Sequence, residues 1–145
     1  MALHCPDSLS SIAVFFSEIS SPKLDVLGDV YSPSIKFRDP INEASGLSQL
    51  REVYARLLEQ LQDVKIVVED AQGDETSGFL LWRMTYTFRE ALHEIRGTSH
   101  LKFAADGRVS RQNDYWDASW PVYGRVPLLG WVMRKVEGLI KVKHS

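Results

Sequence analysis

Apolar residues in the first 62 positions recur at steps of three and four, the spacing of helices that bury one face. The second of the helices indicated in this way is expected to end at Ser32-Pro33, because the residue before a proline avoids helical backbone angles. The third is expected to be capped by Ser48. The pattern therefore predicts three helices, at about residues 8–20, 23–31 and 49–62.

Alternation of apolar and polar residues marks the expected strands. Ile35, Phe37 and Asp39 alternate with polar residues, so a short strand is expected to place Asp39 on the same side as Phe37. The stretch that follows, residues 41–46, is predicted to be a loop. Alternation returns at Val64 and predicts four more strands, at about residues 64–70, 78–88, 95–103 and 109–116.

The strand expected at residues 78–88 has the clearest pattern. One of its faces is wholly large and apolar, formed by Leu80, Trp82, Met84, Tyr86 and Phe88. Tight turns are expected at Gly73-Asp74 and at Asp106-Gly107. Three helices followed by antiparallel strands predict an α+β fold, with the helices packed on one face of a strongly curved sheet.

Residues 121–143 depart from this pattern and predict an amphipathic C-terminal helix. Its apolar stripe consists of Leu128, Leu129, Val132, Met133, Val136, Leu139 and Ile140. We expect this stripe to pack on its own domain or across a dimer, as the apolar face of a globular helix does. Contact with a membrane surface is a less favoured alternative, suggested by Trp131 and the basic residues Lys141 and Lys143.

Length, composition and charge narrow the function classes. The chain has 145 residues, of which 44% are hydrophobic and 25% are charged, as in ordinary globular domains. The net charge is −2, so no excess of lysine and arginine is available to neutralise a nucleic-acid backbone. We expect a single domain over residues 1–145, with its core at about 8–118, and no nucleic-acid partner.

Cys5 is the only cysteine, which excludes an internal disulfide and argues weakly for a reducing compartment. The N-terminus has neither the basic segment nor the long apolar run of a signal peptide, so a cytoplasmic protein is expected. No nucleophile motif and no glycine-rich nucleotide loop is present, and the four histidines lack metal-ligand spacing. We therefore expect neither a metal nor a cofactor. His100, in mid-strand, is expected on the face away from the pocket.

Two carboxylates, Asp39 and Asp114, belong to short strands rich in large side chains. A carboxyl group in an apolar cavity has a raised pKa and can exchange a proton near neutral pH. Each has a structural alternative. Asp39, which precedes Pro40, could accept hydrogen bonds from backbone amides of the following turn. Asp114 could form an ion pair, the candidates being Arg38, Arg96 and Arg111.

The order and spacing of three short motifs resemble the NTF2-like superfamily, which includes ketosteroid isomerases, SnoaL-like polyketide cyclases and scytalone dehydratases. The resemblance covers about residues 8–117, and the chain looks most like bacterial members without an assigned activity. The motifs are Phe37-Arg38-Asp39-Pro40, then Gly46 with Leu50, Arg51 and Tyr54, then Gly107-Arg108-Val109 followed by Asp114-Tyr115-Trp116-Asp117. The resemblance implies a cone of curved sheet around the N-terminal helices, open over an apolar pocket, and often a homodimer.

In the isomerases the aspartate that matches Asp39 is the general base. Two further positions, which hold a tyrosine and a protonated aspartic acid in the isomerases, are matched here by Phe15 and Ser99. Loss of one such oxyanion donor commonly costs about 10²–10³ in rate, so steroid isomerisation is not expected. In the polyketide cyclases an aspartate on the sheet is the acid/base catalyst, and Asp114 is the candidate for that role in this chain.

Two hypotheses follow. The first is a cofactor-free isomerase, cyclase or dehydratase in which Asp39 or Asp114 moves a proton on a small apolar molecule. The second is a non-catalytic binding or dimerisation module whose pocket is filled by its own side chains or by a partner. The candidate ligand-binding residues are Phe15, Phe37, Tyr54, Trp82, Tyr86, Ser99, Phe103, Gln112 and Trp116.

Overall fold

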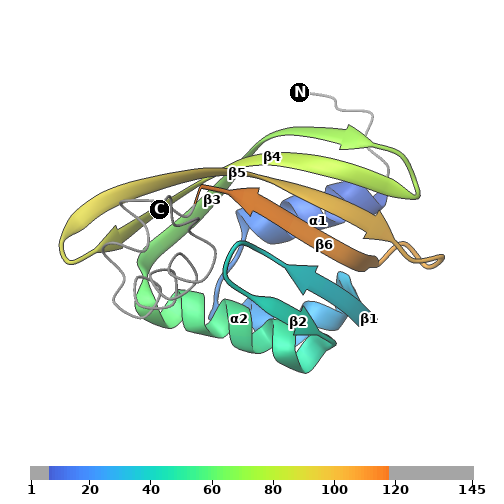
Figure 1. Cartoon of the computed structure of the whole chain (residues 1–145), viewed down its shortest axis with the longest axis horizontal. Coiled ribbons are helices and arrows are strands. Elements are labelled where there is room, and N and C mark those ends of the chain that lie inside the picture. The colour runs from blue at the N-terminus through green and yellow to red at the C-terminus, as the bar shows by residue number, and fades with distance from the viewer. Residues whose placement is uncertain (1–6, 118–145) are drawn as a thin grey trace, which may run out of the picture.

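The structure is a computed structural model that describes residues 7–117 (Figure 1). The predicted helix at 121–143 and Cys5 lie outside the described residues. The helical elements are α1 (Asp7–Ser17), the 3-10 helix η1 (Ser21–Asp29) and α2 (Leu47–Gln60). The strands are β1 (Tyr31–Arg38), β2 (Glu43–Ser45), β3 (Gln62–Gly73), β4 (Ser77–Phe88), β5 (Ala91–Phe103) and β6 (Val109–Trp116).

The six strands form one mixed sheet in the order β2-β1-β6-β5-β4-β3. All neighbouring pairs are antiparallel except β1 and β6, which are parallel. Figure 1 shows the long strands β3, β4 and β5 curving over α1, with α2 on the same side of the sheet. The α+β prediction, with helices on one face of a curved sheet, is confirmed.

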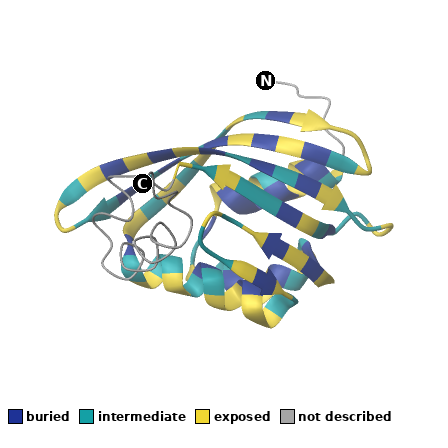
Figure 2. Cartoon of the chain, in the orientation of Figure 1, coloured by how far each residue is buried: buried dark blue, intermediate teal, exposed yellow. Residues whose placement is uncertain are grey.

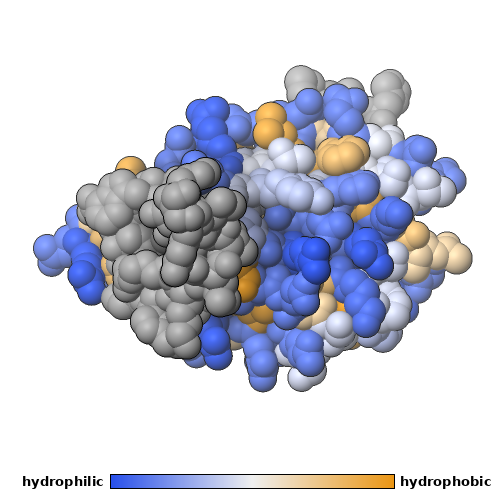
Figure 3. Space-filling model, in the orientation of Figure 1, coloured by the Kyte–Doolittle hydropathy of each residue, from blue (hydrophilic) through white to orange (hydrophobic). Residues whose placement is uncertain are grey.

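The alternation in β4 separates the core from the solvent (Figure 2). Leu80, Trp82 and Tyr86 are buried, whereas Phe79 and Leu81 are exposed on the outer face. Figure 3 shows that the visible surface is mainly hydrophilic, with hydrophobic side chains in small patches. His100 stacks on Phe79 with ring centroids 4.4 Å apart, so it lies on the outer face as predicted. Apolar residues therefore concentrate inside the curve of the sheet.

A glycine shapes the inner face at the site where the largest ring lies. Gly97 on β5 is the cross-strand partner of Trp82 on β4. A Cβ atom at position 97 would overlap the Trp82 ring. The indole can therefore lie across β5, where its Nε1 donates to Ser99 Oγ, two residues beyond Gly97, at 2.9 Å.

The start of β1 differs from the prediction. The second helix ends at Asp29, and the strand already begins at Tyr31, although Ser32-Pro33 was expected to end the helix. The residue before a proline favours extended angles, and these angles suit a strand as well as a helix end. Pro33 is exposed, and the β1–β6 pairing is irregular between Tyr31 and Lys36, where a missing N–H is tolerated. Tyr31 consequently belongs to the sheet.

The region before α2 also differs. The predicted loop 41–46 contains the short strand β2, which pairs with β1. The helix begins at Leu47 with Gly46 as its N-cap, so the cap predicted at Ser48 is wrong. Gly46 has φ 85°, a left-handed conformation that glycine adopts without steric cost. The glycine thereby lets the chain reverse from β2 into α2. The helix then packs on the same side of the sheet as α1 (Figure 1) and buries Leu50 and Tyr54.

Candidate active site

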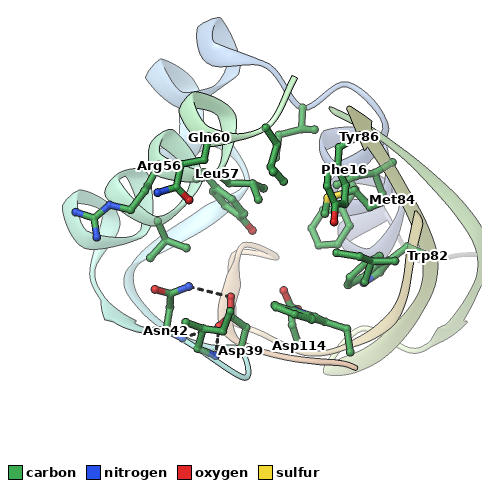
Figure 4. A pocket seen from close by; sticks show the side chains of 18 of the residues that line it. Phe16, Asp39, Asn42, Arg56, Leu57, Gln60, Trp82, Met84, Tyr86 and Asp114 are labelled. Atoms are coloured by element: carbon green, nitrogen blue, oxygen red, sulfur yellow. Dashed lines mark hydrogen bonds between the residues drawn. The ribbon is translucent and has the colours of Figure 1, made fainter. Parts of the chain in front are cut away.

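One pocket of about 110 Å³ lies between α2, the end of α1 and the inner face of the sheet (Figure 4). Its walls are mostly apolar, and its polar groups are few. The residues that line it are Phe16, Ile19, Phe37, Asp39, Ile41, Asn42, Val53, Tyr54, Arg56, Leu57, Gln60, Leu61, Ile66, Trp82, Met84, Tyr86, Ile95, Asp114 and Trp116. A carboxyl-bearing apolar pocket of this kind was predicted from the sequence.

The size of the pocket limits what it can enclose. An apolar cavity of about 150 Å³ accommodates benzene, so this pocket, at about 110 Å³, encloses somewhat less than one such ring. It reaches the surface beside Arg56, which is exposed, and Asn42, which is half-buried. A larger ligand would therefore extend outwards past these two residues.

Asp114 lies on β6 between Gln112 and Trp116, and all three point to the inner face, as strand parity predicts. Ser99 Oγ donates a hydrogen bond to Asp114 Oδ1 at 2.5 Å. Gln112 Nε2 donates to the same oxygen at 2.9 Å and contacts Oδ2 at 3.2 Å. The carboxyl group is thus held by neutral donors from its own strand and from β5.

The alternative for Asp114, an ion pair with an arginine, is not found in the described part of the chain. Two of the three candidates have other partners: Arg38 pairs with Glu43, and Arg96 pairs with Glu94. Burial raises the pKa of Asp114 to about 7; the hydrogen bonds from Ser99 and Gln112 oppose this shift, and the nearby charge of Asp39 adds to it. Both protonation states of Asp114 are therefore accessible near neutral pH.

The hydrogen bonds continue beyond Asp114 in two directions. On one side, Trp82 Nε1 donates to Ser99 Oγ at 2.9 Å. On the other, the Tyr31 hydroxyl donates to Gln112 Oε1 at 2.7 Å, and the Tyr31 and Tyr54 hydroxyls are 2.8 Å apart. Burial raises the pKa of both tyrosines, so both hydroxyls stay protonated at neutral pH. Every hydrogen bond in this network joins neutral side chains to one another or to the Asp114 carboxyl group.

Asp39 lies one residue beyond the end of β1, on the same pocket wall as Asp114 (Figure 4). Its Oδ1 accepts hydrogen bonds from the backbone N–H of Ile41 at 2.8 Å and of Asn42 at 2.6 Å, and its Oδ2 accepts one from Asn42 Nδ2 at 3.3 Å. Burial raises the pKa of Asp39, while these hydrogen bonds oppose the shift. The side chain therefore both holds the turn, as its structural alternative predicted, and lines the pocket.

Most of the candidate ligand-binding residues lie in the pocket wall. Besides Asp39 and Asp114, five of them line it: Phe37, Tyr54, Trp82, Tyr86 and Trp116. The other four do not. Phe15 packs in the core against Tyr31 and Tyr54, and Phe103 lies at the far end of β5, opposite Val109. Ser99 and Gln112 are fully buried behind the wall, where they donate hydrogen bonds to Asp114.

Several lining residues were not predicted, and two kinds of signal could have found them. Val53 and Leu57 belong to the apolar stripe of α2, and Leu61 is its C-cap residue; their spacing marks the face that the helix buries. Arg56 and Gln60 each precede a residue of that stripe, which places them at its polar edge. Asn42 follows an aspartate that forms a turn, and turn residues of this kind commonly lie at the surface of a site.

Within residues 7–117, no cluster of three histidine, cysteine, aspartate or glutamate side chains could hold a metal ion. In the same range, no helix is long and apolar enough to cross a membrane.

A family model of the SnoaL-like domain matches residues 12–112. The chain belongs to the SnoaL-like domain family. This membership agrees with the NTF2-like resemblance of its motifs. No curated protein matches the sequence of this SnoaL-like chain.

Solved structures similar to this SnoaL-like protein share its fold at low sequence identity. A proposed SnoaL-like polyketide cyclase from Jannaschia has a TM-score of 0.70 at 17% identity, over 82% of this chain and 90% of its own. A protein of ketosteroid isomerase-like fold from Catenulispora acidiphila, solved with trimethylamine, has a TM-score of 0.69 at 13% identity, over 84% and 93%. An LEH-like epoxide hydrolase from M. tuberculosis has a TM-score of 0.64 at 9% identity, over 93% and 96%. These likenesses confirm the NTF2-like fold.

The two functions of Asp39 can be separated by two substitutions. Asp39→Asn keeps an oxygen for the backbone amides of Ile41 and Asn42, so the midpoint of urea unfolding should hardly change. Asp39→Ala removes this acceptor and should lower the free energy of unfolding by about 1–2 kcal/mol. Both variants remove the charge of Asp39, so in both the pKa of Asp114 should fall when it is followed by NMR titration. Equal stability of the two variants would contradict the turn-holding function.

Proposed function

We propose that this SnoaL-like protein binds a small apolar molecule and transfers a proton to or from it without a cofactor. The observation that carries the proposal is the placement of Asp114: its carboxyl group faces an apolar pocket and is held by Ser99 and Gln112 with no cation bound to it among residues 7–117. Such a group is a weak enough acid to be reprotonated at neutral pH and a strong enough base to take a proton.

In this proposal Asp114 is the group that exchanges the proton. As a carboxylate it takes a proton from a carbon next to a carbonyl group of the ligand; the C–H bond breaks, an O–H bond forms on Asp114, and the electron pair moves to the carbonyl oxygen. Return of the proton to another carbon atom completes an isomerisation. In a dehydration the electron pair would return to break a neighbouring C–O bond, and the leaving oxygen would take the proton from Asp114 and depart as water. Asp39, on the same wall, is the companion acid/base.

The walls of the pocket support this chemistry by excluding water. The rings of Trp82, Tyr86 and Trp116 and the α2 side chain Leu57 surround the space before Asp114. Two of the neutral donors that line the pocket, the side-chain amides of Asn42 and Gln60, could bind a carbonyl oxygen; Asn42 Nδ2 also donates to Asp39 at 3.3 Å. Steroid isomerisation is not proposed, because Phe15 and Ser99 offer no donor to the pocket.

The test uses carbon acids of about one ring, since the ligand is unidentified. Acetophenone and 3-cyclohexenone are incubated with the protein in D2O, and deuterium uptake next to the carbonyl is followed by mass spectrometry. We expect protein-dependent uptake that rises as Asp114 becomes ionised around pH 7. Uptake no faster than in buffer would contradict proton transfer on this class of compound.

A second candidate function is ligand binding without chemistry. It is favoured by the apolar lining and by the use of Asp39 in a turn, both of which a simple binding protein would share. Under this proposal the same ketones would quench the fluorescence of Trp82 and Trp116 on binding, and no deuterium would enter them.

A further inference from the structure

The hydrogen bonds behind the pocket wall have a fixed direction. Gln112 Oε1 has no hydrogen to give, so at 2.7 Å the Tyr31 hydroxyl must donate to it. Because the proton of Tyr31 is used in this way, the Tyr54 hydroxyl is the donor of the 2.8 Å bond between the two tyrosines. The bonds therefore run from Tyr54 through Tyr31 to Gln112, and from Gln112 Nε2 to Asp114, with a longer bond at 3.4 Å from the same nitrogen back to the Tyr54 hydroxyl.

The same contacts describe the orientation of the Gln112 amide. Its oxygen faces Tyr31, so its Nε2 faces Asp114. Asp114 Oδ1 then accepts two short bonds, from Ser99 at 2.5 Å and from Gln112 at 2.9 Å, whereas Oδ2 has only the longer contact with Gln112 at 3.2 Å. A proton on Oδ1 would collide with the two donors already directed at that oxygen. Oδ2 is the oxygen left to carry it.

We infer that Tyr31, which lies outside the pocket, is a positioning residue that orients the Gln112 amide and thereby makes Oδ2 of Asp114 the proton-exchanging oxygen. The inference rests on the proposed function, and it names the atom and the distant residue that the function would use. Tyr31 is 0% exposed and is absent from the pocket wall, so it touches no ligand, and its link to Asp114 runs through Gln112.

The ionisable groups around Asp114 do not offer another explanation for this orientation. Asp39 faces it from the end of β1, and Tyr54 faces it from α2. Arg56, also on α2, lines the mouth of the pocket and is exposed. On β5 and β4 the groups that approach it are the neutral Ser99 and Trp82. Tyr54 meets the amide only at its nitrogen, at 3.4 Å, so Tyr31 is the group that holds the amide oxygen away from the carboxyl group.

Tyr31→Phe should remove this constraint while keeping the ring in the core. Gln112 Oε1 would lose its donor, and the amide would be free to turn over. In the turned orientation Oε1 faces Asp114 and accepts a hydrogen bond from its protonated form, which favours protonation. The substitution should therefore raise the pKa of Asp114 above its wild-type value of about 7.

The experiment is an NMR titration of the Asp114 side-chain carboxyl carbon in wild type, Tyr31→Phe and Tyr115→Phe, without ligand. Tyr115 is a matched control because it lies on β6 next to Asp114, but its side chain is 61% exposed on the outer face. We expect a rise of at least about half a pH unit in Tyr31→Phe and no change in Tyr115→Phe. An unchanged midpoint in folded Tyr31→Phe would overturn the inference.

A second measurement needs only the wild-type protein, so it applies even if Tyr31→Phe does not fold. The two Gln112 Nε2 protons should shift together with the titration of Asp114, because this nitrogen donates to the carboxyl group. Side-chain amide resonances of Gln112 that stay constant from pH 5 to pH 9 would overturn the proposed orientation. Neither measurement requires turnover, so a positive result with no deuterium uptake would refute the proposed function alone.

Discussion

Asp114→Asn should lower the rate of deuterium exchange by about 10²–10⁴-fold, the usual contribution of a general acid/base. Asparagine has the same shape as aspartate, and its Oδ1 can still accept the bonds from Ser99 and Gln112. The pocket should therefore keep its form and its affinity for ketones. What is lost is the ionisable oxygen Oδ2, which an amide nitrogen replaces and which no other residue of the wall supplies at the same place.

The measurement compares initial rates of exchange for wild type, Asp114→Asn and Asp63→Asn across pH 5–9. Asp63 is an exposed residue with φ 52°, a conformation that asparagine also adopts readily, so its variant serves as an isosteric control. The control should match the wild type. Exchange by Asp114→Asn within about threefold of the wild-type rate would assign the proton transfer to another group, with Asp39 as the first candidate.

The second large effect concerns stability. Asp114 has a pKa of about 7 in the folded protein, against an ordinary value of 3.8. Between these values the folded state binds a proton that the unfolded chain has released, so the free energy of unfolding falls as the pH rises through this window. At about 1.4 kcal/mol per pH unit the full effect is about 4 kcal/mol. Because Asp114 keeps some exposure at the pocket, we expect a loss of about 2–4 kcal/mol.

Urea unfolding of wild type and Asp114→Asn at pH 4.5 and pH 8 would measure this effect. The asparagine cannot ionise, so the variant should lose less stability over this range, and at pH 8 it should be more stable than the wild type. The raised pKa of Asp39, which comes mainly from burial, acts in the same direction in both proteins, so most of its contribution cancels in the comparison. If the free energy of unfolding changed equally with pH in the two proteins, burial would not raise the pKa of Asp114.

Local periodicity was enough to predict most of the sheet. The strand β6 was predicted with its observed limits, and parity placed Asp114 and Trp116 on one face. The position of the hairpin turn also predicts a cross-strand pair. Ser99 lies seven residues before Asp106, and Asp114 lies seven residues after Gly107, so a turn centred on these two residues sets Ser99 opposite Asp114. The hydrogen bond between them could have been predicted.

Other parts of the site depend on contacts between distant segments. Tyr31 was assigned to a helix end because a proline two residues later suggested one, and only its pairing with Val109 on β6 makes it a strand residue. The three-residue strand β2 has too few positions to show a period. The mouth residues Arg56 and Asn42 come together only through the packing of α2 against β1 and β2. Local sequence patterns contain no signal for such contacts.

The parallel pairing of β1 with β6 has a consequence for how the site assembles during folding. The strands β3 to β6 form successive hairpins, whose contacts are close in sequence and can form early. Tyr31 and Gln112, in contrast, are 81 residues apart and meet only when the chain closes a long loop, which is slow because of its entropy cost. The orientation of the Gln112 amide should accordingly be one of the last features to form, and a folding intermediate that lacks β1 would contain Asp114 without the contact that orients its Gln112 donor.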